Sequence, residues 1–241
     1  MIDIHSHLLF EVDDGAKSIK ESVAMLKEAK AQGVEAIILA PHYQHGMYPY
    51  DGKRVDSHFH ELLSYAKEIG IQIYLGCEYH VNGRIVEYLR SGRCRTMAGS
   101  NYVLTEYDEE ADFSYIETVS RKLIQEGYVP IIAHAERCVC MQEMTEQVQL
   151  LRDAGVQIQV NCDAVLGLEG RGLRRLTKRL ISEGQVDYIA SDSHGISDRV
   201  CHMRASYEYV SRKYGTGTAD ILMKENPHRI ITTSATYKGR V

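Results

Sequence analysis

Short apolar segments alternate with helical patterns along the whole chain, and this alternation limits the folds that the chain can adopt. The apolar segments are residues 2–7, 36–41, 71–78, 102–107, 130–134, 157–161 and 188–191. All are short and most of them are largely apolar, which is typical of strands that are buried on both faces. Helical patterns at residues 18–32, 56–69, 113–125, 147–154 and 173–182 separate them. The order predicts an α/β fold in which parallel strands are joined by right-handed helical crossovers.

Glycines mark the ends of the predicted helices. Gly33, Gly70, Gly127, Gly155 and Gly184 each follow a helical pattern and precede a predicted strand. Glycine is favoured there because it adopts the left-handed conformation that ends a helix. No proline-rich or serine-rich linker interrupts the alternation, so we expect residues 1–241 to form a single domain.

Composition excludes several classes of protein. Of the 241 residues, 44% are hydrophobic, which is enough to bury a core and excludes disordered and collagen-like chains. The 28 Lys and Arg against 33 Asp and Glu give a net charge of −5, which argues against nucleic-acid binding. No segment approaches the about 18 apolar residues of a membrane span, and the N-terminus lacks a basic signal-peptide region. We therefore expect a cytoplasmic protein without membrane insertion.

The six cysteines are spread without the regular spacing of a disulfide framework, so we expect reduced thiols. Cys138 and Cys140 form a C-x-C pair that suits a soft metal ion. Two small side chains in a loop are the simpler interpretation of this pair.

Candidate ligands lie where the predicted strands end. They are His5, His7, His42, Glu78, Glu106, His134, Asp192 and His194. The carboxyl ends of parallel strands meet on one face of a barrel, where the following loops build the active site. A doubly wound sheet would normally carry a glycine fingerprint after its first strand, and none follows residues 2–7. The pattern therefore favours a closed barrel related to the (β/α)8 type.

The spacing of these residues predicts metal binding. His5 and His7 are two apart in a predicted strand, so their side chains share a side and can chelate one cation; Asp192 and His194 repeat this spacing. Imidazole and carboxylate ligands together suit Zn, Mn or Fe better than Mg or Ca, and the ligands are too many for one ion. Each residue taken alone can equally be a hydrogen-bonded side chain at a strand end. The whole set at the same end of consecutive strands favours a multinuclear site.

Several motifs together resemble a known family. They are MIDIHSH, DDGAKS, APHY, GCEYH, LTEY, IIAHAER, ASDSHG and the tail segment ENPHRII. In this order they resemble the PHP superfamily of metal-dependent phosphoesterases, most closely the bacterial tyrosine-protein phosphatases of the CpsB/CapC/YwqE type from capsule and exopolysaccharide loci. The resemblance extends over essentially the whole chain and implies a distorted (β/α)7 TIM-like barrel of the PHP fold, with the metal site at the C-terminal ends of the strands.

The resemblance also implies a ligand assignment for about three metal ions, most often Mn²⁺, with Fe or Zn as alternatives. The family pattern groups His5, His7, Glu78 and Asp192 on one ion, Glu78, Glu106 and His134 on a second, and Asp14, His42 and His194 on a third. Chemistry alone does not choose between Asp13 and Asp14, and the family position favours Asp14. Arg137 and Arg199 match two arginines that the family places on the substrate phosphate.

The implied activity is hydrolysis of phosphotyrosine on a partner protein, a bacterial tyrosine kinase that controls capsular or exopolysaccharide synthesis. Water that bridges two divalent ions loses a proton near neutral pH, so a hydroxide can attack phosphorus. A tyrosinate, with a pKa of about 10, leaves with less protonation than an alkoxide. Either Asp13 or a metal-bound water can supply a proton to it. The oligomeric state, including a homo-oligomer, stays open.

Two alternatives to a tyrosine phosphatase remain at this point. One is a PHP phosphatase for a small metabolite such as histidinol phosphate, and the other is a metal-stabilised regulatory domain without chemistry. Cysteine-dependent phosphatases are excluded, because no cysteine is followed six residues later by arginine. Kinases and NTPases of the P-loop type are excluded, because no Walker-type loop occurs.

Three further features have both a functional and a structural interpretation. Tyr43 and its neighbours Tyr48 and Tyr50 either wall a pocket for a phenol ring, with Tyr43 as the substrate-binding residue, or pack their own loop. His80, two residues beyond Glu78, is a weak candidate to support the ligands. The basic segment 171–180 either docks an acidic tail or is a solvated helix face, and the second is the more common explanation.

Overall fold

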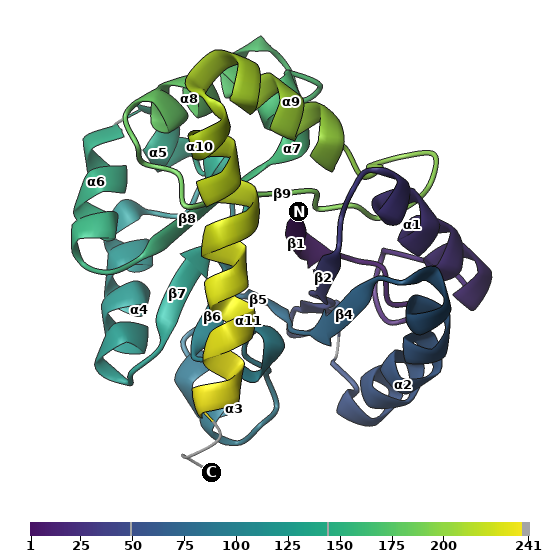
Figure 1. Cartoon of the computed structure of the whole chain (residues 1–241). Coiled ribbons are helices and arrows are strands. Elements are labelled where there is room, and N and C mark those ends of the chain that lie inside the picture. The colour runs from purple at the N-terminus through teal and green to yellow at the C-terminus, as the bar shows by residue number, and fades with distance from the viewer. Residues whose placement is uncertain (49, 144, 238–241) are drawn as a thin grey trace.

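The computed structural model describes residues 1–48, 50–143 and 145–237, which form a curled parallel β-sheet surrounded by helices (Figure 1). One part of the sheet contains, in spatial order, β1 (Ile2–Ser6), β2 (Ala36–Leu39) and β4 (Gln72–Leu75). The other contains, in spatial order, β3 (His42–Tyr43), β5 (Glu78–His80), β6 (Tyr102–Glu106), β7 (Val129–Ile132), β8 (Gln157–Asn161) and β9 (Tyr188–Ala190). Neighbouring strands are parallel throughout. The predicted α/β class and parallel sheet are therefore confirmed.

Two predicted strands end earlier than expected, and each is followed by a second short strand. The segment 36–41 is a strand only over β2, and β3 begins just beyond the segment at His42, because Pro41 between them has no N–H to donate to a ladder. The segment 71–78 divides into β4 and β5 at Gly76. A Cβ on Gly76 would lie 2.8 Å from Met97 Sδ and 3.1 Å from Ile38 Cγ2, so the chain passes too close to its neighbours for a larger residue.

The first strand also contacts the segment that follows the last one. The backbone N–H of Asp192 donates to His5 O at 2.9 Å, and the N–H of His7 donates to Ser193 O at 2.9 Å. Between them the buried carboxylate of Asp3 accepts the Ser191 backbone N–H at 3.0 Å and its hydroxyl at 2.5 Å. These bonds bring residues near position 5 beside residues near position 192.

The helices predicted from the sequence are present, α4 with the predicted bounds and the others with shifted ends. They are α1 (Ile19–Ala31), α2 (Gly52–Ile69), α4 (Phe113–Gln125), α6 (Thr145–Asp153) and α8 (Arg171–Ser182). Gly70 ends α2 in the left-handed conformation at φ 75°, and the other four predicted end glycines also have positive φ. Helical elements that the sequence analysis did not delimit are α3 (Ile85–Arg90), α5 (Val139–Glu143), α7 (Cys162–Leu166), α9 (Met203–Tyr214), α10 (Thr216–Asp220), α11 (Asn226–Tyr237), the short helices η1 (Met97–Gly99) and η2 (Ala135–Arg137), and the π-helix η3 (Ile221–Glu225).

Two hydrophobic clusters stabilise this arrangement. The larger lies between the surrounding helices and the sheet and includes Leu26, Leu62, Ile116 and Leu180. The smaller joins the strands to the C-terminal helix, and its members include Ile2, Ile4, Ile38, Met97, Leu104, Ile131, Tyr188 and Ile230. Helix α11, yellow in Figure 1, crosses in front of the strands. The C-terminal helix is therefore part of the core.

None of the described helices is long and apolar enough to cross a membrane. The six cysteines are free thiols, as expected. Cys138, the first residue of the C-x-C pair, is buried in the larger hydrophobic cluster.

We expect Ile230→Ala to lower the free energy of unfolding by about 2–5 kcal/mol, because it removes a fully buried side chain and leaves a cavity. Urea unfolding followed by circular dichroism measures this change. Thr232→Ala, at an exposed position of the same helix, is the matched control and should change the value by less than about 0.5 kcal/mol. An equally small effect of Ile230→Ala would mean that α11 unfolds independently of the strands.

Candidate metal centre

The predicted metal ligands converge at one end of the sheet. They are His5, His7, Asp14, His42, Glu78, Glu106, His134, Asp192 and His194, all of which contact another member of the set. All of these except His134 fall into groups whose ligand atoms lie within 4.8 Å of one another. The groups are His7, Asp14, His42 and His194; His5, His7 and Asp192; and His42, Glu78 and Glu106. His134 joins them through its Nε2, 2.8 Å from Glu78 Oε1.

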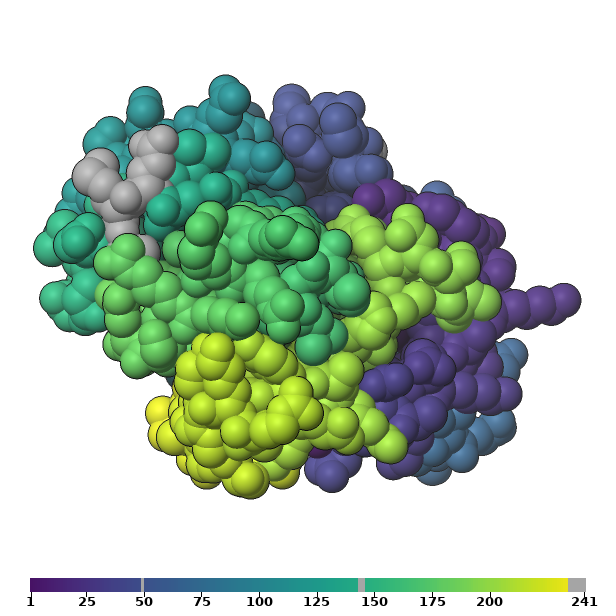
Figure 2. All heavy atoms as spheres, turned by 90° about the horizontal axis from the view of Figure 1, so that it is seen from above, coloured from purple at the N-terminus to yellow at the C-terminus, as the bar shows by residue number. Residues whose placement is uncertain are grey.

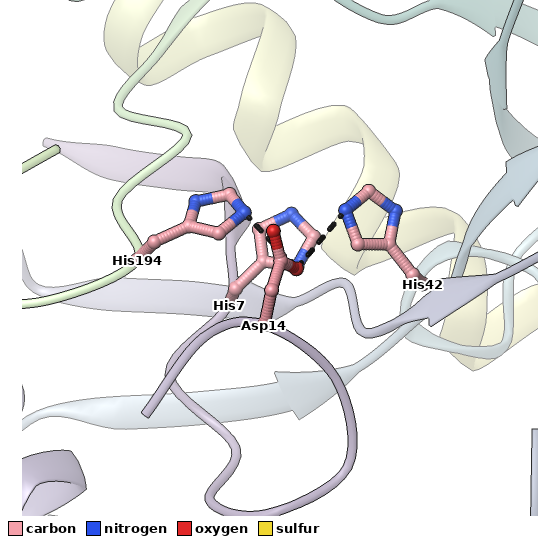
Figure 3. A group of neighbouring side chains, drawn as sticks. All are labelled: His7, Asp14, His42 and His194. Atoms are coloured by element: carbon pink, nitrogen blue, oxygen red, sulfur yellow. Dashed lines mark ion pairs between the residues drawn. The ribbon is translucent and has the colours of Figure 1, made fainter. Parts of the chain in front are cut away.

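One group surrounds the carboxylate of Asp14 (Figure 3). His42 Nε2 and His194 Nε2 lie 3.4 and 3.6 Å from Asp14 Oδ1. The His7 and His194 rings stack with centroids 3.9 Å apart. These side chains come from the loop after β1, the start of β3 and the segment after β9, so their assembly depends on the fold.

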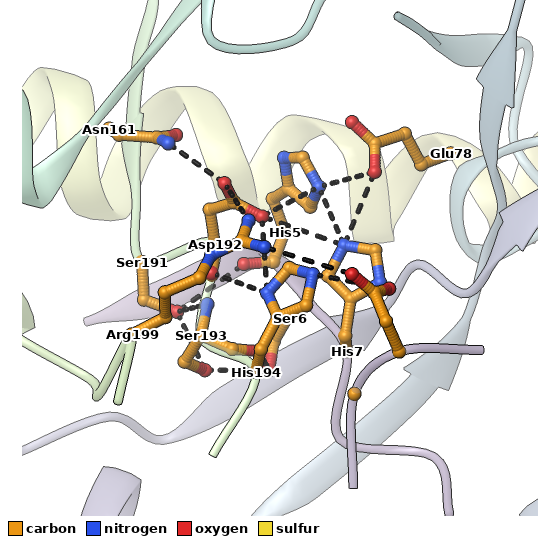
Figure 4. A network of polar contacts seen from close by, with 12 residues as sticks. His5, Ser6, His7, Glu78, Asn161, Ser191, Asp192, Ser193, His194 and Arg199 are labelled. Atoms are coloured by element: carbon orange, nitrogen blue, oxygen red, sulfur yellow. Dashed lines mark hydrogen bonds and ion pairs between the residues drawn. The ribbon is translucent and has the colours of Figure 1, made fainter. Parts of the chain in front are cut away.

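The second group faces Glu78, which is fully buried (Figure 4). His5 Nε2 and His7 Nε2 are 3.1 Å apart, and each lies 3.5 Å from Asp192 Oδ1. Glu78 Oε2 is 3.1 Å from His5 Nε2 and 3.2 Å from His7 Nε2. Two imidazoles and two carboxylates thus point their ligand atoms into the same small volume.

Hydrogen bonds set the tautomers of three histidines. His5 Nδ1 is 3.1 Å from Gln159 Oε1, and the backbone N–H of His134 donates to the same oxygen. His7 Nδ1 is 2.8 Å from Asp13 Oδ2, and His194 Nδ1 is 2.9 Å from Asp192 O. Each partner is an acceptor, so the imidazole donates from Nδ1. In the neutral ring the Nε2 lone pair is then free for a metal ion.

Several ligand atoms are buried without a hydrogen-bond partner in the described part of the chain. They are Asp14 Oδ1, His42 Nδ1, Glu78 Oε2, Asp192 Oδ1 and His194 Nε2. Unpaired buried carboxylate oxygens are costly unless a cation or donor satisfies them. Because these atoms face one another and combine imidazole with carboxylate, the residues fit transition-metal ions.

The charges of this cluster shift its pKa values. Burial raises the pKa of Glu78, but the neighbouring His5 and His42 imidazoles outweigh it and hold that pKa well below its usual range. Burial likewise opposes the ionised form of Asp192, whose pKa His5 and Arg199 nevertheless lower. For His134, burial lowers the pKa and the Glu78 carboxylate raises it, to about 9. The carboxylates therefore stay ionised near neutral pH.

Two of the candidate ligands occupy the left-handed backbone region. His134 has φ 31° and ψ 51°, and Asp192 has φ 51°. Residues with a Cβ adopt this conformation uncommonly, and it persists only where the surrounding structure enforces it. The hydrogen bonds to Gln159 Oε1 and His5 O hold these two backbone N–H groups.

The structure separates the roles of the two adjacent aspartates. Asp13 accepts hydrogen bonds from His7 Nδ1, the His42 backbone N–H and the Gly15 backbone N–H. Burial raises the pKa of Asp13, but His7 more than offsets this and lowers it. Gly15 passes so close to His7 that a Cβ would lie 2.0 Å from His7 O. Asp13 therefore orients the loop and His7, while Asp14 faces the cluster.

Strand β8 contributes supporting residues that the sequence analysis missed. Gln159 Nε2 donates to Asn161 Oδ1 at 2.8 Å, and Asn161 Nδ2 donates to Asp192 Oδ2 at 2.8 Å. Both side chains are buried. The available signal was the alternation of polar and apolar residues in the segment QIQVN, since alternate residues of a strand share a face.

The predicted phosphate-binding arginines lie at the edge of the cluster. Arg199 Nη2 donates to Asp192 Oδ2 at 2.7 Å, and Arg137 Nη1 is 3.6 Å from the same oxygen. Arg137 also pairs with Glu169, a residue that the sequence analysis did not single out. Both guanidiniums thus border the ligand cluster from η2 and from the loop after β9.

The tyrosines at the end of β3 and in the loop that follows it occupy different places. Tyr43 packs among Tyr79, Tyr88 and Tyr50, with ring centroids 5.2, 5.5 and 5.8 Å away. Tyr48 instead stacks on the His42 ring at 5.3 Å with an interplanar angle of 13°. Tyr48 is therefore the tyrosine of this loop that contacts a candidate ligand.

Of the remaining histidines, His80 contacts one of the candidate ligands. Its Nδ1 lies 3.2 Å from Glu106 Oε2 and its Nε2 lies 3.3 Å from Asp108 Oδ1. His80 thereby helps to position the carboxylate of Glu106, which is one of the candidate ligands.

Comparison with known proteins agrees with this geometry. The family model "Capsular polysaccharide synthesis, CpsB/CapC" matches residues 1–232. The chain is 31% identical to the tyrosine-protein phosphatase CpsB of Streptococcus pneumoniae, over 96% of this chain and 98% of the relative. It is 33% identical to the putative tyrosine-protein phosphatase CapC of Staphylococcus aureus, over 83% and 79%.

A solved structure is also similar to this chain. It comes from a crystallographic study of YwqE from Bacillus subtilis and CpsB from Streptococcus pneumoniae, described as unique metal-dependent tyrosine phosphatases. The TM-score is 0.88 with 26% identity, over 97% of this chain and 95% of that one. The likeness therefore extends over nearly the whole fold.

Fold and cluster together define an α/β protein with a curled parallel sheet and a candidate multinuclear metal centre beside two arginines. Within that class, the chain belongs to the CpsB/CapC family of capsular polysaccharide synthesis.

We expect Gln159→Leu to weaken metal binding by about 10–100-fold, because His5 loses the acceptor that sets its tautomer. Isothermal titration with Mn²⁺ measures the affinity. Gln157→Leu is the matched control on the same strand, since Gln157 accepts from the Tyr188 hydroxyl. Unchanged affinity in Gln159→Leu would mean that His5 is held by its other contacts.

Proposed function

We propose that this chain is a metal-dependent protein-tyrosine phosphatase. The observation that carries the proposal is the convergence of the imidazole and carboxylate cluster with Arg137 and Arg199 around Asp192. Relatives over nearly the whole chain are named tyrosine-protein phosphatases, which supports the same substrate class.

In this proposal the nine candidate ligands hold about three divalent ions, most often Mn²⁺. When bound, such ions would supply activation of a water molecule for attack on phosphorus and positive charge for the phosphoryl oxygens. The protein residues keep the ligand atoms in place. His5, His7 and His194 present Nε2 because Nδ1 is engaged, and Glu78 stays ionised between several imidazoles.

In this proposal Arg137 and Arg199 bind the phosphate dianion. Phosphoryl transfer needs positioning and charge neutralisation more than covalent help, and a guanidinium can donate two parallel hydrogen bonds to phosphate oxygens. The side chain of Arg137 is 26% exposed and that of Arg199 is 37% exposed, so both guanidinium groups are partly shielded from water. Desolvation strengthens their attraction for an anion.

Tyr48 supplies an aromatic wall beside the cluster. Its ring lies against His42, so the phenyl ring of a phosphotyrosine whose phosphate contacts the cluster would lie next to it. Tyr43 is surrounded by other tyrosines, which favours packing of its own loop over substrate binding.

A tyrosinate leaving group suits this site, because the lowered pKa of Asp13 makes that carboxyl a poor proton donor. Tyrosinate needs less protonation than an alkoxide. If a proton is still needed, the solvent that bound metal ions would activate could supply it. The substrate protein would be a bacterial tyrosine kinase of capsule or exopolysaccharide synthesis, acting with this enzyme in the cytoplasm.

We also propose the distorted (β/α)7 barrel. Counting β2 with β3 and β4 with β5 as two bent strands leaves seven strands, and the hydrogen bonds between β1 and residues 192–193 support closure. The proposal treats the whole chain, 1–241, as one domain; positions 49, 144 and 238–241 lie outside the described residues.

We expect purified protein with Mn²⁺ to hydrolyse phosphotyrosine peptides at least about tenfold faster than phosphoserine peptides, because tyrosinate is the better leaving group. Phosphate release measured on both peptides and on histidinol phosphate tests this.

Arg137→Ala should lose most turnover while its metal content, measured by mass spectrometry, is unchanged. Faster hydrolysis of histidinol phosphate would favour the small-metabolite alternative, and loss of metal in Arg137→Ala would make Arg137 structural.

We expect Tyr48→Ala to raise KM for phosphotyrosine peptides by about 3–10-fold, since stacking with an aromatic ring contributes about 0.5–1.5 kcal/mol. Tyr48→Phe keeps the ring and should restore KM. Steady-state kinetics with both variants measure the effect, and Tyr43→Phe, in the preceding strand β3, is the control. Equal KM values for Tyr48→Ala and the unchanged enzyme would contradict the aromatic wall.

A further inference from the structure

Helix α8 carries a charge pattern that the candidate metal centre does not use. Its 12 residues include Arg171, Arg174, Arg175, Lys178 and Arg179 and contain no Asp or Glu. The helices α1, α2, α4 and α9 each carry acidic as well as basic residues. A single-sign helix is unexpected in a chain whose net charge is −5.

This pattern opposes the stability of α8 itself. Arg171, Arg175 and Arg179 are exposed and follow one another at four-residue spacing, where like charges repel. Arg171 also stands in the first turn, where the helix dipole disfavours cations. Gly170 provides no side-chain cap and the first turn has no acidic residue. The helix therefore has an electrostatic cost that an anionic partner would relieve.

Most of this charge has no internal partner. Arg179 pairs with Glu183 just beyond the helix at 2.8 Å, and Arg174 lies over the Tyr209 ring. Arg171, Arg175 and Lys178, which we call the basic face of α8, form no ion pair with any residue in the described ranges. Seen from above in Figure 2, the green surface around α8 is not covered by the rest of the chain.

The basic face begins beside the candidate active site. Glu169, two residues before α8, contacts Arg137, and α8 packs against η2, which carries Arg137. Leu176 and Leu180 are buried and fix the helix on the core. A helix of this length spans about 18 Å, which matches about five residues of an extended chain.

We propose that the basic face of α8 binds an acidic segment next to the phosphotyrosine of the substrate protein. The inference rests on the proposed function, because it assumes that the phosphate reaches Arg137. A phosphotyrosine dianion at Arg137 and carboxylates along α8 would meet positive charge at both places. Electrostatic complementarity of this kind selects among partners and aids their encounter.

The test compares two triple variants with the same change in charge. Arg171→Glu, Arg175→Glu and Lys178→Glu remove the basic face, and Lys27→Glu, Lys67→Glu and Lys122→Glu alter exposed lysines on other helices. The substrates are a phosphotyrosine peptide flanked by glutamates, the same peptide with glutamines, and p-nitrophenyl phosphate, which is too small to reach α8.

For the α8 variant we expect KM for the acidic peptide to rise about tenfold with kcat unchanged, and the preference of the unaltered enzyme for that peptide to shrink in high salt. KM for the glutamine peptide and turnover of p-nitrophenyl phosphate should not change in either variant. The thermal midpoint of the α8 variant should be equal or higher, because carboxylates suit the first turn of a helix and gain opposite-charge neighbours in Arg174 and Arg179.

Three results would overturn the inference. An equal KM for the acidic peptide in the unaltered enzyme and the α8 variant, or an equal rise in both triple variants, would exclude specific docking. Loss of binding to phosphatidylglycerol vesicles in the α8 variant, with peptide kinetics unchanged, would assign the face to an anionic membrane surface. Failure of the unaltered enzyme to hydrolyse any aryl phosphate would instead refute the proposed function.

Discussion

The hydrogen bonds between β1 and the segment after β9 hold the candidate metal centre together. His5 and His7 lie at the beginning of the chain, while Asp192 and His194 lie near its other end. Two backbone hydrogen bonds of 2.9 Å and the buried carboxylate of Asp3 join these segments. Without this junction the ligands would be separated by the length of the sheet, and no local sequence signal could bring them together.

The cluster that this junction creates is costly in the isolated chain. Buried carboxylate oxygens of Glu78 and Asp192 lack hydrogen-bond partners among the described residues, and His134 and Asp192 have left-handed backbones. The two hydrophobic clusters offset this cost, and the hydrogen bonds of Gln159 and Asn161 prevent the cluster from relaxing. Such local conflict with stability is expected where residues are arranged for binding.

Charge is distributed unevenly over the molecule. The chain is acidic overall, yet Arg137 and Arg199 border the ligand cluster, and the proposed basic face extends along α8 from the segment that contacts Arg137. In the proposed phosphatase the phosphate and its surrounding carboxylates would meet cations in succession. The net charge of −5 does not reveal this arrangement, because it sums the charges of the whole chain.

The sequence by itself determined the alternation of strands and helices and the residue types at the strand ends, because burial periodicity and glycine ends are local properties. It also determined the candidate ligands, whose residue types suit transition-metal ions. It did not locate the strand ends at Pro41 and Gly76. These depend on which strands are hydrogen-bonded to each other and on the side chains packed against Gly76. It did not choose Asp14 by chemistry, distinguish Tyr48 from Tyr43, or identify Gln159, Asn161 and Glu169. Only the tertiary structure decided those points, because each depends on backbone and side-chain contacts that form only in the folded chain.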